Sequence, residues 1–255
     1  GMVENIDDNM GILIDKLNQW NVLENTLVIF MTDNGMAMKG IGQKDKGRLI
    51  AGNAGMRGTK DTNWEGGTRV PSFWYWKGML SEGVDISALT AHIDLYRTFC
   101  KLAGVGIPKS SLTPKGRSLL PLLKDPTDNW KDRILFSHRG RWGGGGRGKP
   151  TRAEAKYYGA SVRNTRWRLV FEMDSAGPWL SDISKDPGET KNLIKVHSEV
   201  AEKMKKEYDQ WWDSTESYLV NEGLPRITAG EHHLQLLYDK QFTEKGIPDW
   251  EPEDL

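Results

Sequence analysis

Residues 26–35 read Thr26-Leu-Val-Ile-Phe-Met-Thr-Asp-Asn-Gly35, an apolar run that stops at a polar turn. Its continuous aliphatic and β-branched side chains are typical of a strand covered on both faces. Just before it, residues 3–20 place apolar side chains at steps of three and four, which predicts an amphipathic helix. A helix, a strand and a polar glycine-containing turn in this order favour a parallel α/β sheet, whose ligands bind at the carboxyl ends of its strands.

The segment that follows the turn is rich in glycine and poor in periodic apolar residues, so we expect a long irregular connection over 36–67. Residues 70–76 then predict a second buried strand. A helix is expected within 86–103, and the side chains that its spacing turns inward are Ile93, Tyr96, Phe99, Leu102 and Ala103.

The pattern changes near Asp125-Pro126, where short apolar segments begin to follow one another closely. These segments predict a small antiparallel sheet, with strands over 133–137, 158–162, 166–171 and 179–183. A helix is expected over about 198–214, followed by a stretch with little periodicity. We therefore divide the chain into an α/β portion at 2–125, a small α+β subdomain at 126–220 and an irregular tail at 221–255.

Composition excludes several classes of function. The 35 basic and 35 acidic side chains cancel, so the net charge indicates neither a nucleic acid nor a membrane surface as partner. Cys100 is the only cysteine of the 255 residues, which excludes an intrachain disulfide and a multi-cysteine metal site. The apolar runs are shorter than the ~20 residues that a membrane span requires. We expect no signal peptide, because the chain begins directly with a helical pattern.

Two polar segments are candidates for chemistry. Asp33 and Asn34 offer hard oxygen ligands at the end of a strand, which suit Ca²⁺ or Mg²⁺, although Asp-Asn-Gly is also a favoured β-turn. Lys60 ends the glycine-rich stretch Gly55-Met-Arg-Gly-Thr-Lys60, where its ammonium could meet a tetrahedral oxyanion. The flanking Arg57 and Arg69 either assist it or are structural, paired with Glu65 or with backbone carbonyls.

These motifs, in this order, resemble the second half of a type I sulfatase of the arylsulfatase family. The resemblance rests on Thr26–Gly35, on Asn53-Ala-Gly-Met-Arg-Gly-Thr-Lys60 and on Glu65-Gly-Gly-Thr-Arg-Val-Pro71. It continues through His92-Ile-Asp-Leu95 and through Asp182-Ile-Ser-Lys-Asp-Pro-Gly-Glu-Thr-Lys-Asn-Leu193, so that it covers most of residues 3–215.

The resemblance implies an α/β fold of the alkaline-phosphatase superfamily: the C-terminal part of a mostly parallel sheet with flanking helices, plus the small antiparallel sheet and C-terminal helix. It implies hydrolysis of sulfate esters with bound calcium, for which Asp33 and Asn34 match the metal ligands. Lys60 matches the lysine that binds the sulfate group. By resemblance the protein would be periplasmic or extracellular.

The chain departs from the family pattern at the nucleophile. The family forms a formylglycine from the Cys or Ser of a C-x-P-x-R motif, whereas Cys100 is followed by Lys-Leu-Ala-Gly and no serine has the required proline and arginine. The nucleophile and the remaining metal ligands are therefore expected in an N-terminal half, and this chain alone is expected to be inactive. Asp61 stands where the family usually has a glycine.

Further candidates for substrate binding are His92 and the stretch 138–149, which contains His138, Arg139 and Arg141 and no acid. A basic, glycine-rich segment could gather a sulfated small molecule or glycan, or it could be a solvated loop. His92 is either a substrate contact or a structural histidine.

Two functions remain open on the sequence. The first is a calcium-dependent sulfatase present as a C-terminal fragment, and the second is a non-catalytic binding module with a sulfatase-like half-fold. A hydrolase of phosphate or phosphonate esters is less consistent with the Arg57–Lys60 and Glu65–Pro71 motifs. We also expect self-association, because a half-domain would leave sheet edges and apolar faces uncovered.

Overall fold

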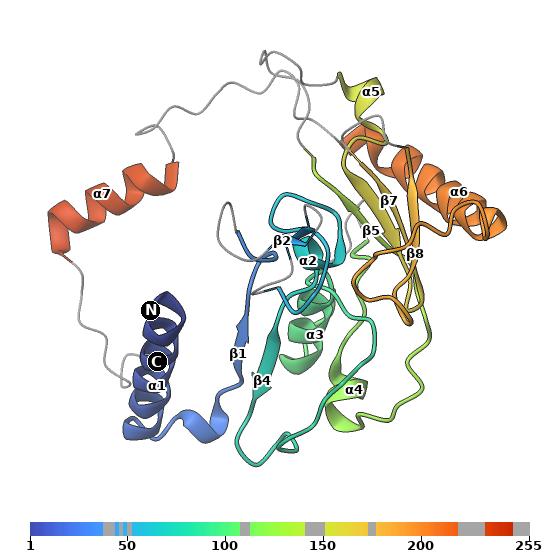
Figure 1. Cartoon of the computed structure of the whole chain (residues 1–255). Helices are drawn as coiled ribbons and strands as arrows, with labels where there is room; N and C mark the ends of the chain where they lie inside the picture. The colour runs from blue at the N-terminus through green and yellow to red at the C-terminus, as the bar shows by residue number, and fades with distance from the viewer. Residues whose placement is uncertain are drawn as a thin grey trace.

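The computed structural model of the chain (Figure 1) describes residues 1–37, 44–45, 48–49, 53–107, 113–140, 151–172, 177–218 and 233–246. Helix α1 (Met2–Gln19) and a short 3₁₀ turn, η1 (Leu23–Asn25), lead into strand β1 (Val28–Met31). The expected N-terminal helix and the strand after it are thus confirmed. Two further strands, β2 (Lys44–Asp45) and β3 (Arg48–Leu49), form a hairpin of two residue pairs.

Strand β1 pairs with β4 (Ser72–Tyr75), and the pairing is antiparallel, with Val28 opposite Tyr75 and Met31 opposite Ser72. The parallel arrangement expected for these strands is therefore wrong. The reason is that the chain between them returns to the end at which β1 stops, where the N–H of Gly35 donates to the carbonyl of Gly67 at 2.9 Å. A parallel partner would need a crossover to the opposite end.

The two strands are also less covered than their apolar sequences predict. Residues of β1 are half-buried, and β4 is mostly exposed, with 66% of Phe73 accessible. Helix α1 buries none of its side chains. Within the described ranges, this part of the chain therefore presents uncovered apolar surface.

Helix α3 (Asp94–Leu102) forms where expected, but it turns the opposite face inward. Ile93, Tyr96 and Phe99 are each 44–51% exposed, whereas Asp94 and Thr98 are completely buried. The polar face is buried because hydrogen bonds satisfy it: Thr98 Oγ1 accepts the N–H of Leu119 at 2.9 Å. The next helix in the chain, α4 (Leu120–Lys124), begins directly after Leu119 and buries Leu122.

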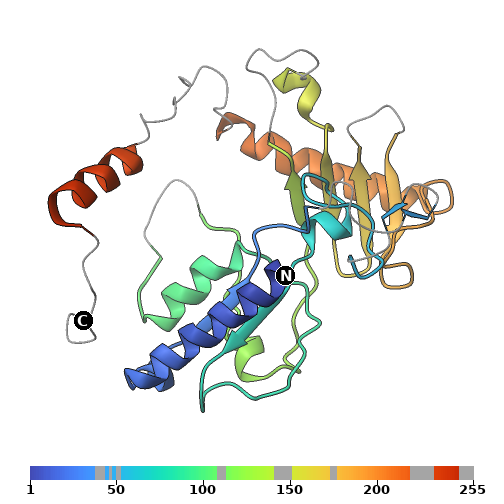
Figure 2. The same cartoon turned by 60° about the vertical axis from the view of Figure 1, so that its left-hand side comes forward.

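The C-terminal subdomain confirms the predicted antiparallel sheet. Its strands are β5 (Leu135–His138), β6 (Ala160–Arg163), β7 (Trp167–Phe171) and β8 (Trp179–Asp182), paired in the order β5-β6-β7-β8. Helix α5 (Arg152–Ala155) precedes β6, and helix α6 (Ser198–Thr215) runs along the sheet (Figures 1 and 2). Apolar and aromatic side chains fill the layer between α6 and the sheet, among them Val162, Leu169, Leu180, Met204 and Tyr208.

The tail expected to be irregular contains a helix. After a second 3₁₀ turn, η2 (Glu216–Tyr218), helix α7 spans His233–Lys245. Its sequence lacks an amphipathic period, but Leu, Gln, Lys and Glu are good helix formers, which explains a helix without an apolar face. Among the described residues, no helix combines the length and apolar character needed to cross a bilayer.

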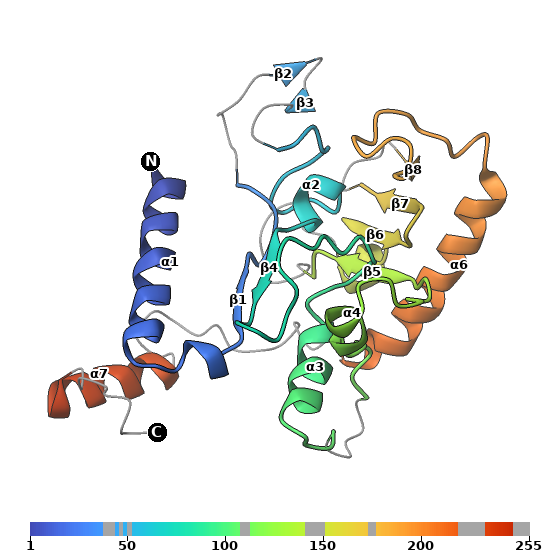
Figure 3. The ribbon, with the colours of Figure 1, turned by 90° about the horizontal axis from the view of Figure 1, so that it is seen from below.

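Helix α2 (Glu65–Thr68) links the two parts of the molecule. It lies between β4 and the β7–β8 side of the C-terminal sheet (Figure 3). Its residues Glu65, Gly66 and Gly67 are buried. The glycine-rich segment therefore occupies the junction between the α/β portion and the C-terminal subdomain.

Candidate functional site

The Asp33-Asn34-Gly35 turn is fixed against α2 by direct contact between backbones. The N–H of Gly35 bonds to the carbonyl of Gly67, and the hydroxyl of Thr32 donates to the carbonyl of Asn34 at 3.1 Å. A Cβ on Gly35 would lie 1.9 Å from the carbonyl oxygen of Gly66, so only glycine permits this approach. The packing places Asp33 and Asn34 at the junction of the two parts.

The stretch 57–64, hereafter the Lys60 loop, lies beside this turn. Asn53 Nδ2 donates to the carbonyls of Met56 and Gly58 at 3.0 and 2.6 Å and thereby closes the turn that leads into the loop. The N–H of Lys60 donates to the carbonyl of Met36 at 3.0 Å, one residue after Gly35. The backbone of Lys60 is therefore tied to the segment that carries Asp33 and Asn34, and its side chain is exposed.

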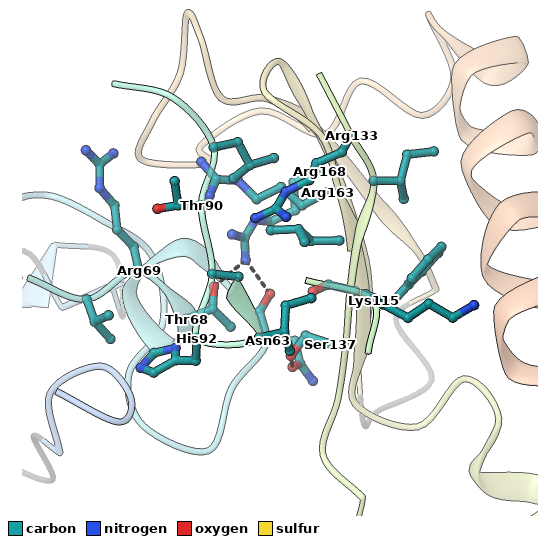
Figure 4. Close-up of a pocket in the computed structure, with 18 of the residues that line it drawn as sticks. Asn63, Thr68, Arg69, Thr90, His92, Lys115, Arg133, Ser137, Arg163 and Arg168 are labelled. Carbon is teal, nitrogen blue, oxygen red and sulfur yellow. Dashed lines mark hydrogen bonds between the residues drawn. The ribbon is translucent and has the colours of Figure 1, made fainter. Parts of the chain in front are cut away.

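A cavity of about 1210 Å³ lies at this junction (Figure 4). Asp33, Asn34, His92 and Arg139 line it, and so do residues of β5 and β6. The Lys60 side chain is not part of the lining, although the next two residues are. The structure thus brings together four of the residues singled out in the sequence and places Lys60 at the border.

The four predicted histidine and arginine contacts have different positions. His92 is exposed, and its Nε2 lies 2.9 Å from the carbonyl oxygen of Thr32, next to Asp33. His138 lies outside the cavity lining: its ring packs 5.0 Å from that of Trp212, and its nitrogens contact the carbonyl of Ala155 and the N–H of Gly140.

Because Nδ1 of His138 accepts the Gly140 N–H, Nε2 carries the proton and donates to Ala155. Burial lowers the pKa of His138, consistent with a neutral ring that serves the structure. Arg141 lies outside the described residues.

Several cations of the cavity wall are neutralised by buried acids. Arg133 forms a two-pronged ion pair with Asp94, at 2.7 Å for its Nη1. Asp94 also accepts the N–H groups of Ala91 and Arg117, so it is a buried anchor that joins three segments. Asp94 is the first residue of α3, and the N-cap of the helix is Ile93.

A second cluster of buried charges surrounds α2, and sequence reasoning missed it. We define the Glu65 cluster as Glu65, Arg163, Arg168 and Glu189. Glu65 accepts hydrogen bonds from Arg168 at 2.7 Å and from Arg163 at 3.2 Å, and its own N–H donates to the carboxylate of Glu189 at 2.7 Å. Arg168 also donates to Thr68 Oγ1 and to the carbonyl of Asn63, both at 2.8 Å (Figure 4).

Burial gives this cluster unusual electrostatics. Glu65, Arg168 and Glu189 are each at most 2% exposed. Desolvation raises the pKa of Glu189 to about 7, against the opposing attraction of Arg168. The one signal in the sequence is Arg168, a single charge in an otherwise apolar strand, which needs a buried partner.

The arginines beside Lys60 have the structural role that was one of their two interpretations. Arg69 pairs with Glu65 at 3.4 Å. The guanidinium of Arg57 lies between the rings of Trp64 and Trp179, 3.6 and 4.2 Å from their centroids, and it donates to the carbonyl of Glu189. The Lys60 loop is thereby attached to the C-terminal subdomain.

The donor set for a metal fits calcium in kind. Asp33 and Asn34 supply a carboxylate and an amide oxygen, the ligand types that calcium takes. Among the described residues there is no group of three or more acidic, histidine or cysteine side chains around a common point. A complete coordination shell of about six to eight oxygens would therefore need ligands beyond this pair.

Comparison with known proteins identifies the family of the chain. Residues 59–213, more than half of the chain, match the family model described as N-sulphoglucosamine sulphohydrolase, C-terminal, and residues 1–105 match the model described as Sulfatase. The chain belongs to the sulfatase family. The resemblance found in the sequence is thus confirmed, and the match to a C-terminal model agrees with its position in the second half of a sulfatase.

Each alignment with a relative covers only part of this chain and part of the relative. Steryl-sulfatase of Homo sapiens is 31% identical over 137 residues, which is 53% of this chain and 23% of the relative. N-acetylgalactosamine-6-sulfatase of Homo sapiens is 34% identical over 140 residues, or 54% and 25%. The crystal structure of Ps i-CgsB in complex with k-i-k-neocarrahexaose is 27% identical, with a TM-score of 0.64 over 83% of this chain and 42% of the other. This sulfatase chain therefore matches about a quarter of the length of these two curated relatives.

Proposed function

We propose that the chain supplies the metal-binding and sulfate-binding half of a site that hydrolyses sulfate esters. The observation that carries the proposal is the bond from the Lys60 N–H to the carbonyl of Met36, which ties the Lys60 loop to the turn of Asp33 and Asn34 in a member of the sulfatase family. A carboxylate and an amide then line the cavity, and the lysine precedes two lining residues, Asp61 and Thr62.

Each group has a defined task in this proposal. Asp33 and Asn34 would hold calcium, which when bound withdraws charge from the sulfate oxygens. Lys60 would place its ammonium against a sulfate oxygen, where charge grows as the ester bond breaks. His92 at the cavity wall would contact the alcohol part of the substrate.

No residue of this chain fits the nucleophile motif, so no bond-making step is assigned to it. Binding without bond-making does not lower the barrier to hydrolysis. We therefore expect the chain alone to bind an aryl sulfate and not to turn it over, and to contribute to turnover when an N-terminal half with a formylglycine is joined or added.

For the natural substrate we propose a sulfated glycan or sulfated small molecule. The supporting observations are the size of the cavity and two of the relatives, a sulfatase of an amino sugar and a structure in complex with an oligosaccharide. Arg139 in the cavity wall would face the anionic groups of such a substrate.

The experiment is calorimetric titration of the chain with 4-nitrophenyl sulfate in the presence of calcium. We expect Lys60→Ala to weaken binding by about tenfold, the value of one charge-assisted contact. Lys185→Ala, which removes an exposed lysine from the C-terminal subdomain, is the matched control. Equal affinity of the two variants would contradict the proposal, and binding without turnover by the joined halves would favour the non-catalytic module.

A further inference from the structure

The Lys60 loop and α2 are held mainly from the C-terminal subdomain. Arg57 is stacked on Trp179 of β8, and Asn63 accepts the hydroxyl of Ser137 of β5 at 2.7 Å. Glu65 and Thr68 are bonded to Arg168 of β7. The contacts are distributed over the whole segment 57–68, so its position follows that of the C-terminal sheet.

The same segment, which contains Lys60, is bonded on its other side to the residues that follow the proposed metal ligands Asp33 and Asn34. Lys60 donates to Met36, and Gly67 accepts from Gly35. A shift of α2 would therefore move the Asp33-Asn34 turn and the Lys60 backbone relative to one another. Two backbone hydrogen bonds transmit the position of the C-terminal subdomain to the site.

Glu189 is at the centre of the attachment. It is completely buried, its carboxylate accepts the N–H of Glu65, and its carbonyl accepts Arg57. Its backbone has φ of +52°, a conformation that residues with long side chains rarely adopt. The charged side chains that interact electrostatically with its carboxylate are Arg168, Glu65 and Arg57.

We propose that Glu189 is a positioning residue for the sulfate-binding group: by holding the first residue of α2 it sets where Lys60 stands relative to Asp33 and Asn34. This inference rests on the proposed function, because it assumes that Lys60 meets the sulfate. It assigns to the C-terminal subdomain a part in binding the reacting group as well as a part in enclosing the substrate. Arg168 acts with Glu189 by fixing both ends of α2 through Asn63, Glu65 and Thr68.

The test is a double-mutant cycle on the binding of 4-nitrophenyl sulfate in the presence of calcium. We expect Glu189→Ala to raise the Kd about tenfold when Lys60 is present and less than twofold in the Lys60→Ala background, because it acts through Lys60. Glu189→Gln keeps an oxygen that accepts the Glu65 N–H, so we expect it to restore most of the affinity.

Asp209→Asn is the matched control. Asp209 is a partly buried carboxylate of the same subdomain that pairs with Lys156 and Lys205, away from α2. We expect its Kd to stay within twofold of the unsubstituted chain. If Glu189→Ala does not fold, Arg168→Lys is the second variant: it keeps the charge and cannot form all three of the arginine's bonds, so we expect about a fivefold higher Kd.

Hydrogen exchange separates this inference from the proposed function. In Glu189→Ala we expect exchange to accelerate in peptides covering 32–37 and 57–68 and to stay unchanged in α6. An unchanged Kd for Glu189→Ala, the same tenfold loss without Lys60, or faster exchange throughout the chain would each overturn the inference. If Lys60→Ala alone leaves the Kd unchanged, the proposed function fails, and selective exchange then decides whether Glu189 still positions the loop.

Discussion

Replacing glycine by alanine is expected to have opposite effects on the free energy of unfolding at Gly35, which contacts α2, and at Gly11, which is exposed on α1. In Gly35→Ala, the added Cβ would lie 1.9 Å from the carbonyl oxygen of Gly66 and 2.9 Å from Cα of Gly67. Those are backbone atoms, so no side-chain rotation relieves the overlap. In Gly11→Ala, the Cβ meets no atom within 4 Å on an exposed turn of α1.

The magnitudes follow from these distances. The turn and α2 must separate by about 1.5 Å to restore an ordinary contact of 3.4 Å, which breaks the Gly35–Gly67 hydrogen bond. Overpacking of this kind costs ~1–3 kcal/mol and the lost bond ~1 kcal/mol, so we expect Gly35→Ala to lower the free energy of unfolding by roughly 2–4 kcal/mol. Gly11→Ala should raise it by about 1 kcal/mol, because alanine is the better helix former.

Urea unfolding followed by circular dichroism measures both changes against the unsubstituted chain. Titration with 4-nitrophenyl sulfate and calcium then shows whether the folded Gly35→Ala variant also binds more weakly, as expected if Asp33 and Asn34 move. A Gly35→Ala variant within about 0.5 kcal/mol of the parent, the usual range of an exposed substitution, would refute the close approach of the two backbones.

Three other predictions concern stability and assembly. Because the pKa of Glu189 is raised to about 7 in the folded chain from an ordinary 4.5, the stability associated with its protonated form is complete below pH 4.5 and is lost as pH rises through 7. Between pH 5 and 8 the free energy of unfolding, measured by urea titration, should therefore fall by roughly 2–3 kcal/mol more in the parent than in Glu189→Gln, and parallel profiles would contradict this. Asp61 has φ of +69°, so Asp61→Gly should raise the free energy of unfolding by about 0.5–1 kcal/mol in the same assay, whereas a loss would mean that the side chain is needed. The exposed Val3, Phe73 and Ile93 predict self-association, measured as a rise of the light-scattering mass with concentration, and a constant monomer mass across micromolar concentrations would count against it.

Much of the local structure could be predicted because its signals are local. The apolar run at 26–32 forms β1, and the closely spaced segments after residue 126 form the four-stranded sheet. The periodic stretch near 198–214 forms α6, which buries Met204 and Tyr208. In each case the side chains that determine the element are close in sequence, about one helical turn apart in a helix or two residues apart in a strand.

The errors arose where distant residues decide. The apolar stripe of α3 predicted Ile93 and Phe99 inside, but the ion pair between Asp94 and Arg133, 39 residues apart, buries the polar face instead. Likewise, the direction of β4 is set by the bond between Gly35 and Gly67. Apolar periodicity gives no information about which buried polar group finds a partner.

The candidate site divides in the same way. The motif resemblance predicted Asp33, Asn34 and Lys60, and the structure places them on segments that are bonded to one another. The Glu65 cluster was not predicted because its members lie far apart in the chain: Arg168 follows Glu65 by 103 residues and Glu189 follows it by 124. A single sequence does not show which distant charge pairs with which.

The span of the Glu65 cluster also orders events during synthesis. Glu65 emerges from the ribosome 124 residues before Glu189, the acceptor of its N–H. At about 5–20 residues per second, that interval is roughly 6–25 s. Glu189 is absent for all of it, and Arg168, which lies 103 residues after Glu65, is absent for most of it. The glycine-rich segment therefore remains without its attachment until the C-terminal sheet has been made, and the Lys60 loop is among the last parts of the chain to reach its final position. A nascent chain released before residue 189 would carry every proposed ligand of the site and lack Glu189, the residue that we propose positions them.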